Sequence, residues 1–280
     1  MVVNCKELSE SIKKDIKKRI DNLKNRNINV CLAVILVGDD PASKIYVRNK
    51  KRACEQLDII SKEYILDKSS SKGEILSLID TLNKDSSING ILVQLPLPNN
   101  INKIEIMSAI DPKKDVDAFN PINIGKMMLG VSDVFPCTPS GIIEIINFCN
   151  IDLTGECCTV IGRSDIVGKP MAHLLTAKNA TVTLCHSRTK DLKKHCQNAD
   201  VLISAVGKPK FITSDMVKKD SVVIDVGINR DESGKICGDV DFESVKDVVK
   251  YITPVPGGVG PMTITMLMKN TVDLAEIQNE

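Results

Sequence analysis

The sequence contains no tryptophan and only three tyrosines and five phenylalanines among its 280 residues. A hydrophobic core in such a chain must be built mainly from aliphatic side chains. No apolar run reaches the roughly 18 residues of a membrane-spanning helix, and the first residues lack the apolar segment of a secretory signal peptide. We therefore expect a cytoplasmic protein that does not enter a membrane.

Positive and negative charges are nearly balanced, since the sequence has 37 basic and 36 acidic residues and a formal net charge of +1. This balance predicts neither a nucleic-acid partner nor binding to an anionic membrane surface. The ten cysteines include no C-x-x-C pair, and most, such as Cys31 and Cys158, lie among apolar residues. The pattern predicts reduced, mostly buried thiols rather than a disulfide framework or a zinc site.

Apolar segments with the length of strands alternate with amphipathic segments with the length of helices along the chain. This alternation predicts an α/β protein with parallel sheets and right-handed crossovers. A proline-containing segment at 136–139 marks a boundary, so we expect one domain at 1–138, completed by a C-terminal helix at 262–280, and a second domain at 139–261. The predicted strands are 30–37, 59–66, 91–95, 158–161, 180–184, 200–205 and 222–226, and the predicted helices are 8–23, 41–57, 73–82, 121–129, 141–149, 169–177 and 262–277.

The first strand and helix define the most informative stretch. Residues 30–37 form an apolar run that is typical of a strand buried on both faces. Asp40 is placed to cap the following helix, and Pro41 fits its first turn. Tyr46 and Lys50 are four residues apart and project from one face of that helix, which starts at the sheet edge where α/β proteins bind ligands. We hypothesise that Lys50 is a reactive lysine with Tyr46 beside it; the alternative is a solvated lysine next to a half-buried tyrosine.

Two further polar residues, Gln94 and Asp117, are candidates for a functional site. Gln94 ends the second buried strand, and its amide needs partners: it is either a structural glutamine or a hydrogen-bond partner of Lys50 at the same sheet edge. Asp117 lies in a charged loop, and its apolar neighbours indicate that the carboxylate points inward. Asp115 and Asp117 have the D-x-D spacing of some metal sites, but the other ligands of a calcium loop are absent, so no metal is predicted.

A glycine-rich turn at 162–168 joins a buried strand to a helix, which is the arrangement that binds phosphate through backbone N–H groups. Roughly 20 residues later, where NAD-binding folds place an acidic residue, this chain has Ser187 and Arg188. Arg163 lies in the turn itself. Cations and a hydroxyl suit a 2′-phosphate, so the sequence favours NADP over NAD, the alternative being ordinary surface arginines. Gly207, after a later strand, allows a nicotinamide ring to approach the backbone.

These segments together resemble the bifunctional methylenetetrahydrofolate dehydrogenase/cyclohydrolase family. The resemblance implies oxidation of 5,10-methylenetetrahydrofolate by NADP+ and hydrolysis of the methenyl product to 10-formyltetrahydrofolate. It also implies two parallel-sheet α/β domains, the second Rossmann-like, with a substrate cleft between them, in a homodimer. The segments that carry it are 46–54, 90–98, 115–117, 136–139, 161–168, 223–229 and 252–263.

The resemblance also implies roles for single residues. Lys50 is the catalytic lysine, Tyr46 stacks on the folate, Gln94 tunes Lys50, and Asp117 binds the pterin. A loop at 256–260 closes over the substrate. The remaining substrate-binding positions are Leu95, Pro256, Gly257 and Gly260, and the cofactor-binding positions are Thr138, Gly162, Arg163, Ser164, Ile166, Ser187, Arg188, Gly207 and Ile228.

The chemistry requires an unusual lysine. Lys50 activates water near neutral pH only if its pKa falls from about 10 toward 7 or 8. Burial, the cationic substrate and the neighbouring cations Lys51 and Arg52 are expected to lower it, while Gln94 accepts a hydrogen bond without adding a countercharge. Ala118 departs from the family, which usually has glycine after Asp-Val-Asp, so a positive φ there would be strained.

Three alternative functions share features with this sequence. A family member that has lost one activity is the nearest, and Ala118 is the only reason in the sequence to consider it. Short-chain dehydrogenases share the Tyr-x-x-x-Lys spacing of Tyr46 and Lys50, but there the pair follows the cofactor glycines, whereas here it precedes Gly162. The order of these motifs rejects that class. A nucleotide-binding module without activity would not need the full set of polar residues described above.

Overall fold

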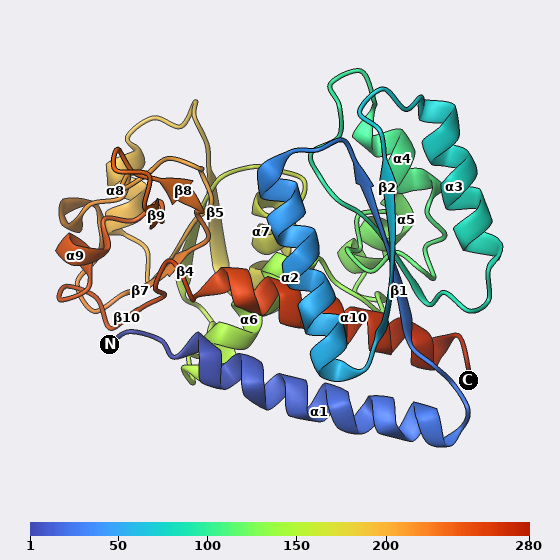
Figure 1. The fold of residues 1–280 in the computed structure, drawn as a ribbon. Coiled ribbons are helices and arrows are strands. Elements are labelled where there is room, and N and C mark those ends of the chain that lie inside the picture. Colours follow the sequence, from blue (N-terminus) through green and yellow to red (C-terminus); the bar gives the residue numbers. More distant parts are fainter. The chain divides into compact units, whose positions relative to one another are not determined.

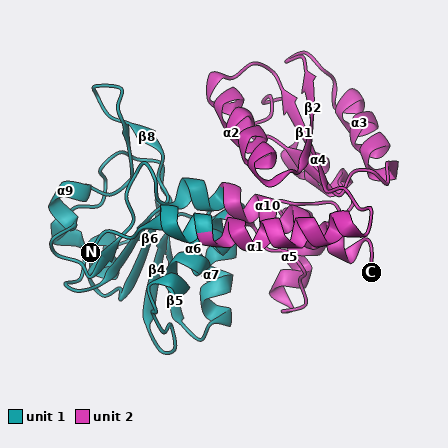
Figure 2. Ribbon diagram, turned by 60° about the horizontal axis from the view of Figure 1, so that its bottom comes forward, with its two compact units in different colours: residues 1–10, 138–263 teal, residues 11–137, 264–280 magenta.

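The computed structural model describes all 280 residues and divides into two compact units, which Figure 2 distinguishes by colour. Unit 1 comprises residues 1–10 and 138–263, and unit 2 comprises residues 11–137 and 264–280. Two long helices, α1 (Cys5–Asn25) and α10 (Val259–Ile277), contribute residues to both units. No helix has the length and apolar character needed to cross a membrane. The predicted mixed α/β fold with two parallel sheets is confirmed.

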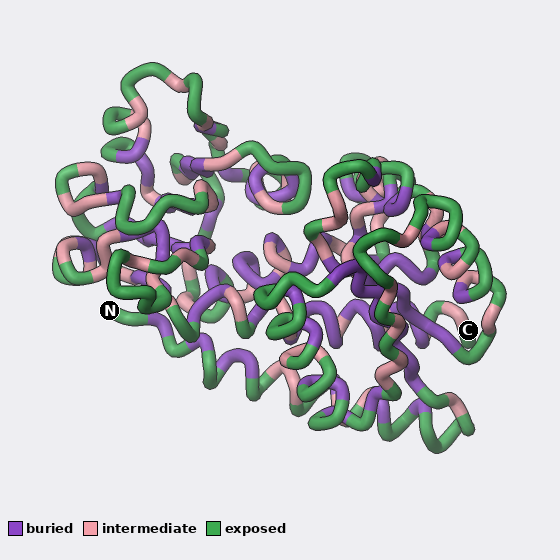
Figure 3. Tube along the Cα trace, turned by 45° about the horizontal axis from the view of Figure 1, so that its top comes forward, coloured by how far each residue is buried: buried purple, intermediate pink, exposed green.

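Unit 2 is built on a three-stranded parallel sheet in the order β2-β1-β3. Every residue of the central strand β1 is buried, and Figure 3 colours the trace by burial. Alternate side chains of β1 belong to two cores. Leu32 and Leu36 pack with α1, α2 and α10, whereas Ala33 and Val37 pack with α3 and α4 on the other face (Figure 1). The elements are β1 (Cys31–Val37), α2 (Pro41–Leu57), β2 (Ile60–Leu66), α3 (Lys72–Lys84), β3 (Gly90–Val93), α4 (Lys103–Ala109) and α5 (Pro121–Met128).

Unit 1 contains a five-stranded parallel sheet in the order β10-β7-β6-β4-β5. This is a doubly wound order in which the chain reverses direction across the sheet between β4 and β6, and such switch points are where ligands bind. A short antiparallel hairpin, β8–β9, follows β7. The elements are α6 (Cys137–Phe148), β4 (Cys157–Ile161), α7 (Gly168–Ala177), β5 (Thr181–Cys185), α8 (Leu192–Gln197), β6 (Val201–Ser204), η1 (Ser214–Met216), β7 (Val222–Asp225), β8 (Asn229–Arg230), β9 (Ile236–Cys237), α9 (Phe242–Val245) and β10 (Tyr251–Ile252).

The predicted elements are present, and their ends differ by a few residues. The helices α6 and α10 begin earlier than expected, because Pro139 and Pro261 both lie within a first turn, where the missing N–H is not needed. The strand β3 ends at Val93 rather than at residue 95, although the Gln94 N–H still donates to the carbonyl of Ile35. Short elements without a clear period, such as α4 and the β8–β9 hairpin, were not predicted, whereas α9 begins directly after 238–241, where a turn into a helix is expected.

Candidate active site

The helix α2 places Lys50 at the carboxyl end of the first sheet. Asp40 caps the helix, since its side chain accepts a hydrogen bond from the Ser43 N–H at 2.8 Å, as predicted. Two and a half turns later the Lys50 Nζ atom donates to Gln94 Oε1 at 2.9 Å. The hydrogen bond between these two residues, one of two alternatives for Gln94 in the sequence, is therefore present. Tyr46 is half-exposed, one helical turn before Lys50.

The amide of Gln94 is fixed in one orientation. Its Nε2 atom donates to the carbonyl of Leu95 at 2.6 Å, so the oxygen of the amide is the atom that faces Lys50. The backbone N–H of Gln94 pairs with Ile35 at 2.8 Å and continues the ladder between β1 and β3. Because Gln94 is buried and its bond to Lys50 is partly buried, the lysine amine meets a neutral acceptor that is shielded from bulk water.

Burial controls the charges around Lys50. Removal from water lowers the pKa of Lys50, and the nearby Asp117 carboxylate and the Cys137 and Cys54 thiols oppose this effect. Burial likewise raises the pKa of Asp117, while Lys50 and the Cys137 thiol lower it. The pKa of Cys137 lies well above its usual value, mainly because of burial and then because of Asp117. The site is a compact group of an amine, a carboxylate and a protonated thiol.

The expected source of the lysine's low pKa was partly wrong. Lys51 and Arg52 are exposed, and neither is among the groups that shift the pKa of Lys50. Lys51 points to the Glu63 carboxylate at 3.5 Å. Burial alone lowers the pKa, and the one charged neighbour, Asp117, raises it. The free amine is thus favoured by desolvation, against the attraction of a carboxylate.

The loop that carries Asp117 touches β3 through a single bridge. Asp115 pairs with Ile91 in a parallel bridge, which directs Asp117 toward the end of β3. This close approach depends on Gly90, because a Cβ atom there would lie 2.3 Å from Val116 Cγ1. A larger residue in place of Gly90 would push the loop away from the sheet and with it the carboxylate.

A left-handed residue follows Asp117. Ala118 has φ = 56°, so an alanine occupies the left-handed conformation that favours glycine. The strain is of order 1 kcal/mol and is held by hydrogen bonds around it. Asp115 Oδ2 accepts from the Asn120 N–H at 2.7 Å and from Asn123 Nδ2 at 3.0 Å. The turn is therefore preserved in spite of the extra methyl group.

The buried carboxylate of Asp115 can be tested by measuring the stability of the protein at different pH values. Burial raises the pKa of Asp115 to about 6, so the folded protein holds this proton more tightly than the unfolded chain does. The free energy of unfolding therefore loses this contribution as pH rises from about 4 to 6. The free energy of unfolding of Asp115→Asn minus that of the wild type should increase by about 1–3 kcal/mol between pH 4 and pH 7. Urea denaturation at both pH values measures this difference.

The control for this change is Asp67→Asn. Hydrogen bonds from Ser69 hold the pKa of the exposed Asp67 below its usual value. Its contribution to stability is therefore present above the unfolded pKa and lost on acidification, which is the opposite trend. If the difference in unfolding free energy between Asp115→Asn and the wild type does not change with pH, the raised pKa of the buried Asp115 is contradicted.

The glycine turn of unit 1 has the geometry of a phosphate-binding site. Ser164 Oγ accepts hydrogen bonds from the backbone N–H groups of Val167 and Gly168, at 3.2 and 3.3 Å, which closes the turn at the start of α7. A Cβ atom on Gly168 would lie 1.9 Å from the carbonyl oxygen of Gly162, so only glycine fits. Arg163 is exposed within the turn. Helix N-termini with such turns attract anions.

The other candidate cofactor residues meet at the same sheet edge. Ser187 and Arg188 follow β5, Gly207 follows β6, and Ile228 follows β7, and all four are exposed. Because parallel strands end at one edge, these residues lie along the same side as the glycine turn. Ile166 is exposed beside them.

Two further groups of candidates lie near the ends of α6 and α10. Thr138, at the start of α6, shares a hydrogen bond with Thr263 at 3.0 Å. The loop with Pro256 and Gly257 is exposed and precedes α10. Gly260, in the first turn of α10, lies against the side chain of Ile228, since a Cβ atom on it would be 3.7 Å from Ile228 Cδ1. All of these residues belong to unit 1, whereas Lys50, Gln94, Leu95 and Asp117 belong to unit 2.

Sequence reasoning missed two buried carboxylates that order the edge of the second sheet. Asp239 is fully buried and accepts from the backbone N–H groups of Val206 at 2.7 Å and Lys208 at 3.0 Å, after β6. Asp225 accepts from the Gly227 N–H at 2.9 Å, after β7, and burial raises its pKa to about 6. The sequence of 238–241 predicts a turn that leads into a helix, and nothing in its spacing shows that its carboxylate reaches another strand.

The fold and the site define a class of protein: a nucleotide-dependent α/β enzyme whose second unit carries a buried lysine amine. Residues 3–117 match the model of the tetrahydrofolate dehydrogenase/cyclohydrolase catalytic domain, and residues 136–279 match that of the tetrahydrofolate dehydrogenase/cyclohydrolase NAD(P)-binding domain. The chain belongs to the tetrahydrofolate dehydrogenase/cyclohydrolase family.

Relatives match over nearly the full length. The chain is 56% identical to the bifunctional protein FolD of Acetivibrio thermocellus, over 99% of this chain and 97% of the relative. Its identity to the Bacillus subtilis bifunctional protein FolD is 50%, over 98% and 97%. The crystal structure of Campylobacter jejuni FolD has a TM-score of 0.97 at 51% identity, covering 99% of both chains. That of Trypanosoma brucei FolD, complexed with NADP cofactor and inhibitor, has a TM-score of 0.96 at 32% identity, covering 100% and 98%.

Proposed function

We propose that this chain oxidises 5,10-methylenetetrahydrofolate with NADP+ and hydrolyses the methenyl product to 10-formyltetrahydrofolate. The observation that carries the proposal is the Lys50 amine, which is held by Gln94 Oε1 at 2.9 Å and whose pKa burial lowers. A buried lysine with a neutral acceptor is suited to proton transfer near neutral pH. Nothing in the geometry favours a member with one activity only, because the turn at Ala118 keeps its left-handed conformation.

The residues of unit 1 fit a dinucleotide with a 2′-phosphate. The turn that Gly168 makes possible lies at the start of α7, where a helix N-terminus suits the pyrophosphate, and Arg163, Ser187 and Arg188 offer cations and a hydroxyl at the same edge. NADP+, when bound, accepts the hydride from the methylene carbon. The part of this chain is to bind the cofactor and align it, with Thr138, Gly162, Ser164, Ile166, Gly207 and Ile228 as further contacts.

Each polar residue of unit 2 has a proposed task in this reaction. The Asp117 carboxylate accepts the adjacent N–H groups of the pterin's 2-amino-4-oxo edge, and Tyr46 stacks on the folate. Lys50 takes a proton from the water that adds to the methenyl carbon. The bond from this carbon to N5 then breaks, N5 gains a proton, and the formyl group stays on N10. Gln94 keeps the amine in place, and Leu95, Pro256, Gly257 and Gly260 line the substrate.

The test is to measure the two half-reactions separately on the purified protein. Oxidation is followed by NADPH formation with methylenetetrahydrofolate, and hydrolysis by the loss of methenyltetrahydrofolate absorbance without cofactor. Both activities are expected. Cofactor binding without turnover would identify a nucleotide-binding module instead, and a single activity would identify a specialised family member.

Replacing Arg163 with alanine is expected to narrow the preference for NADP over NAD. Loss of a cation at the 2′-phosphate should raise the KM for NADP+ about tenfold, while the KM for NAD+, which lacks that phosphate, stays unchanged. The measurement is the ratio of kcat/KM for the two cofactors. Lys178→Ala, which removes an exposed cation at the other end of α7, is the control. An unchanged ratio in Arg163→Ala would refute the assignment.

The domain roles and the assembly complete the proposal. Residues 1–138, with the helix at 262–280, carry the folate chemistry, and residues 139–261 bind NADP. A cytoplasmic location agrees with the ten free cysteines, seven of which are buried. A homodimer is supported by β5, which is an edge strand and leaves Leu184 exposed, since unpaired edges tend to pair with a second copy.

A further inference from the structure

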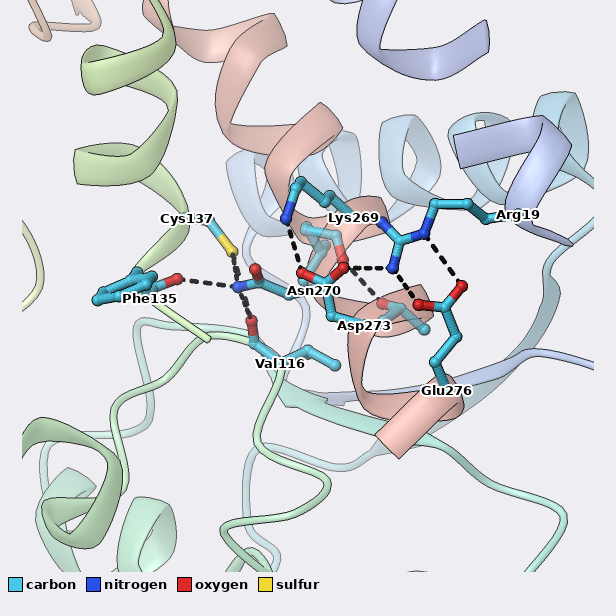
Figure 4. A network of polar contacts seen from close by, with 10 residues as sticks. Arg19, Val116, Phe135, Cys137, Lys269, Asn270, Asp273 and Glu276 are labelled. Atoms are coloured by element: carbon cyan, nitrogen blue, oxygen red, sulfur yellow. Dashed lines mark hydrogen bonds and ion pairs between the residues drawn. The ribbon is translucent and has the colours of Figure 1, made fainter. Parts of the chain in front are cut away.

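Asn270, on α10, joins two loops of unit 2 (Figure 4). Its Nδ2 atom donates to the carbonyl oxygens of Val116 at 2.8 Å and Phe135 at 2.9 Å, and it lies 3.5 Å from Cys137 Sγ. Both strong partners are acceptors, so the amide nitrogen must face them and its two N–H groups are both used. The residue is 3% exposed, so these bonds are shielded from solvent and an apolar side chain in its place would leave both carbonyls without a donor.

One of the two carbonyls belongs to the residue directly before Asp117. A hydrogen bond to the Val116 oxygen fixes the peptide plane between Val116 and Asp117, and the Cys137 thiol donates to the same oxygen at 3.4 Å. On the other side of Asp117, Ala118 is held in the left-handed region at φ = 56°. The backbone of Asp117 is therefore fixed from both sides, which sets the direction of its carboxylate.

The helix that supplies the amide is itself anchored within unit 2. Arg19 of α1 donates to Asp273 at 2.6 Å and to Glu276 at 2.5 Å, and Lys269 lies 2.9 Å from Asp273 (Figure 4). Asp273 has only 13% of its side chain exposed, so these pairs are partly protected from water. Asn270 therefore acts from a rigid element, as a positioning group must.

We propose that Asn270 is a positioning residue that aims Asp117 at the pterin and at Lys50. It does not touch the reacting atoms, because its donors end on the two backbone carbonyls. The inference rests on the proposed function, since Asp117 needs its exact direction only if it binds folate. Loss of Asn270 frees the peptide before Asp117, and displacements of about 1 Å at such a group reduce turnover about 100-fold.

The experiment compares Asn270→Leu with Gln278→Leu. Gln278 is the matched control because it also donates from the C-terminal segment to two backbone carbonyls, those of Asn89 at 2.9 Å and Lys113 at 2.6 Å. Asn270→Leu should lower kcat/KM for both folate substrates about 10- to 100-fold, with an unchanged dissociation constant for NADP+. Gln278→Leu should leave both activities within about twofold of wild type.

A double-mutant cycle separates positioning from general destabilisation. If Asn270 acts through Asp117, then adding Asn270→Leu to Asp117→Asn should change kcat/KM by less than about twofold. The same loss in both backgrounds, or wild-type kcat/KM in Asn270→Leu, would overturn the inference. Should Asn270→Leu not fold, Asn270→Ser, which keeps one donor, is judged by the same two comparisons. Absence of both activities in the wild type would instead refute the proposed function.

Discussion

Lys50→Met is expected to abolish hydrolysis of methenyltetrahydrofolate, with a loss of about 100- to 10,000-fold in kcat, and to leave NADP affinity nearly unchanged. Methionine fills a similar volume but has no basic nitrogen, so the attacking water loses its proton acceptor. The Gln94 oxygen, which accepts from Lys50 at 2.9 Å, loses its donor as well. Hydrolysis is measured by the decay of methenyl absorbance, and NADP affinity by titration calorimetry.

The dependence of this reaction on pH gives a second readout. The free amine is the active form, so the hydrolysis rate of the wild type should rise with pH through the pKa of Lys50, which burial lowers. Lys50→Met should lack this limb. The control is Lys51→Met, which removes the neighbouring exposed amine and should leave hydrolysis intact. Equal losses of hydrolysis and NADP binding in Lys50→Met would mean that the lysine is structural.

Asp117→Asn should lower kcat/KM for both folate reactions about 100-fold or more. The amide presents one acceptor where the carboxylate presents two, and its N–H groups oppose those of the pterin. Both activities need the same folate orientation, so both should fall together, while the KM for NADP+ is unaffected. The two initial-rate assays on one preparation measure this.

Asp117→Asn also predicts a shift in the pH profile of the remaining hydrolysis. The Asp117 carboxylate raises the pKa of Lys50, so its removal should lower that pKa further and move the acid limb to lower pH. Asp111→Asn is the control, because Asp111 lies in the same loop and caps only the Lys113 N–H. Loss of one activity alone, or an acid limb that moves upward, would contradict the proposed place of Asp117.

Local chemistry made much of unit 2 predictable. The apolar run before Asp40 could only be a buried strand, and the cap and proline after it fixed where α2 starts. Spacing along that helix then placed Lys50 at the sheet edge, where Gln94 also arrives because parallel neighbouring strands end together. The conformation of Ala118 was equally predictable. An alanine in place of glycine is strained only where φ is positive, and Ala118 has a positive φ.

Contacts made by loops were less predictable. Asp117 lies in a loop with no hydrophobic period, so its approach to Lys50 could not be derived. Lys51 and Arg52 were expected to lower the pKa of Lys50, but burial lowers it and neither cation contributes. The carboxylate of Asp239 and the amide of Asn270 satisfy backbone groups far away in the chain. Such partners depend on how loops close in space, which neither propensity nor periodicity encodes.

The shared helix α10 has a consequence for how the protein is made. Its residues Met266, Leu267 and Val272 belong to the same core as Leu32 and Leu36 of β1. On the ribosome, residues 138–263 must be synthesised before the rest of this helix emerges, so α1 and α2 cover one face of the earliest sheet only in part throughout that interval. The unit whose strands are synthesised first is therefore completed last. Chaperones recognise exposed apolar surface of this kind.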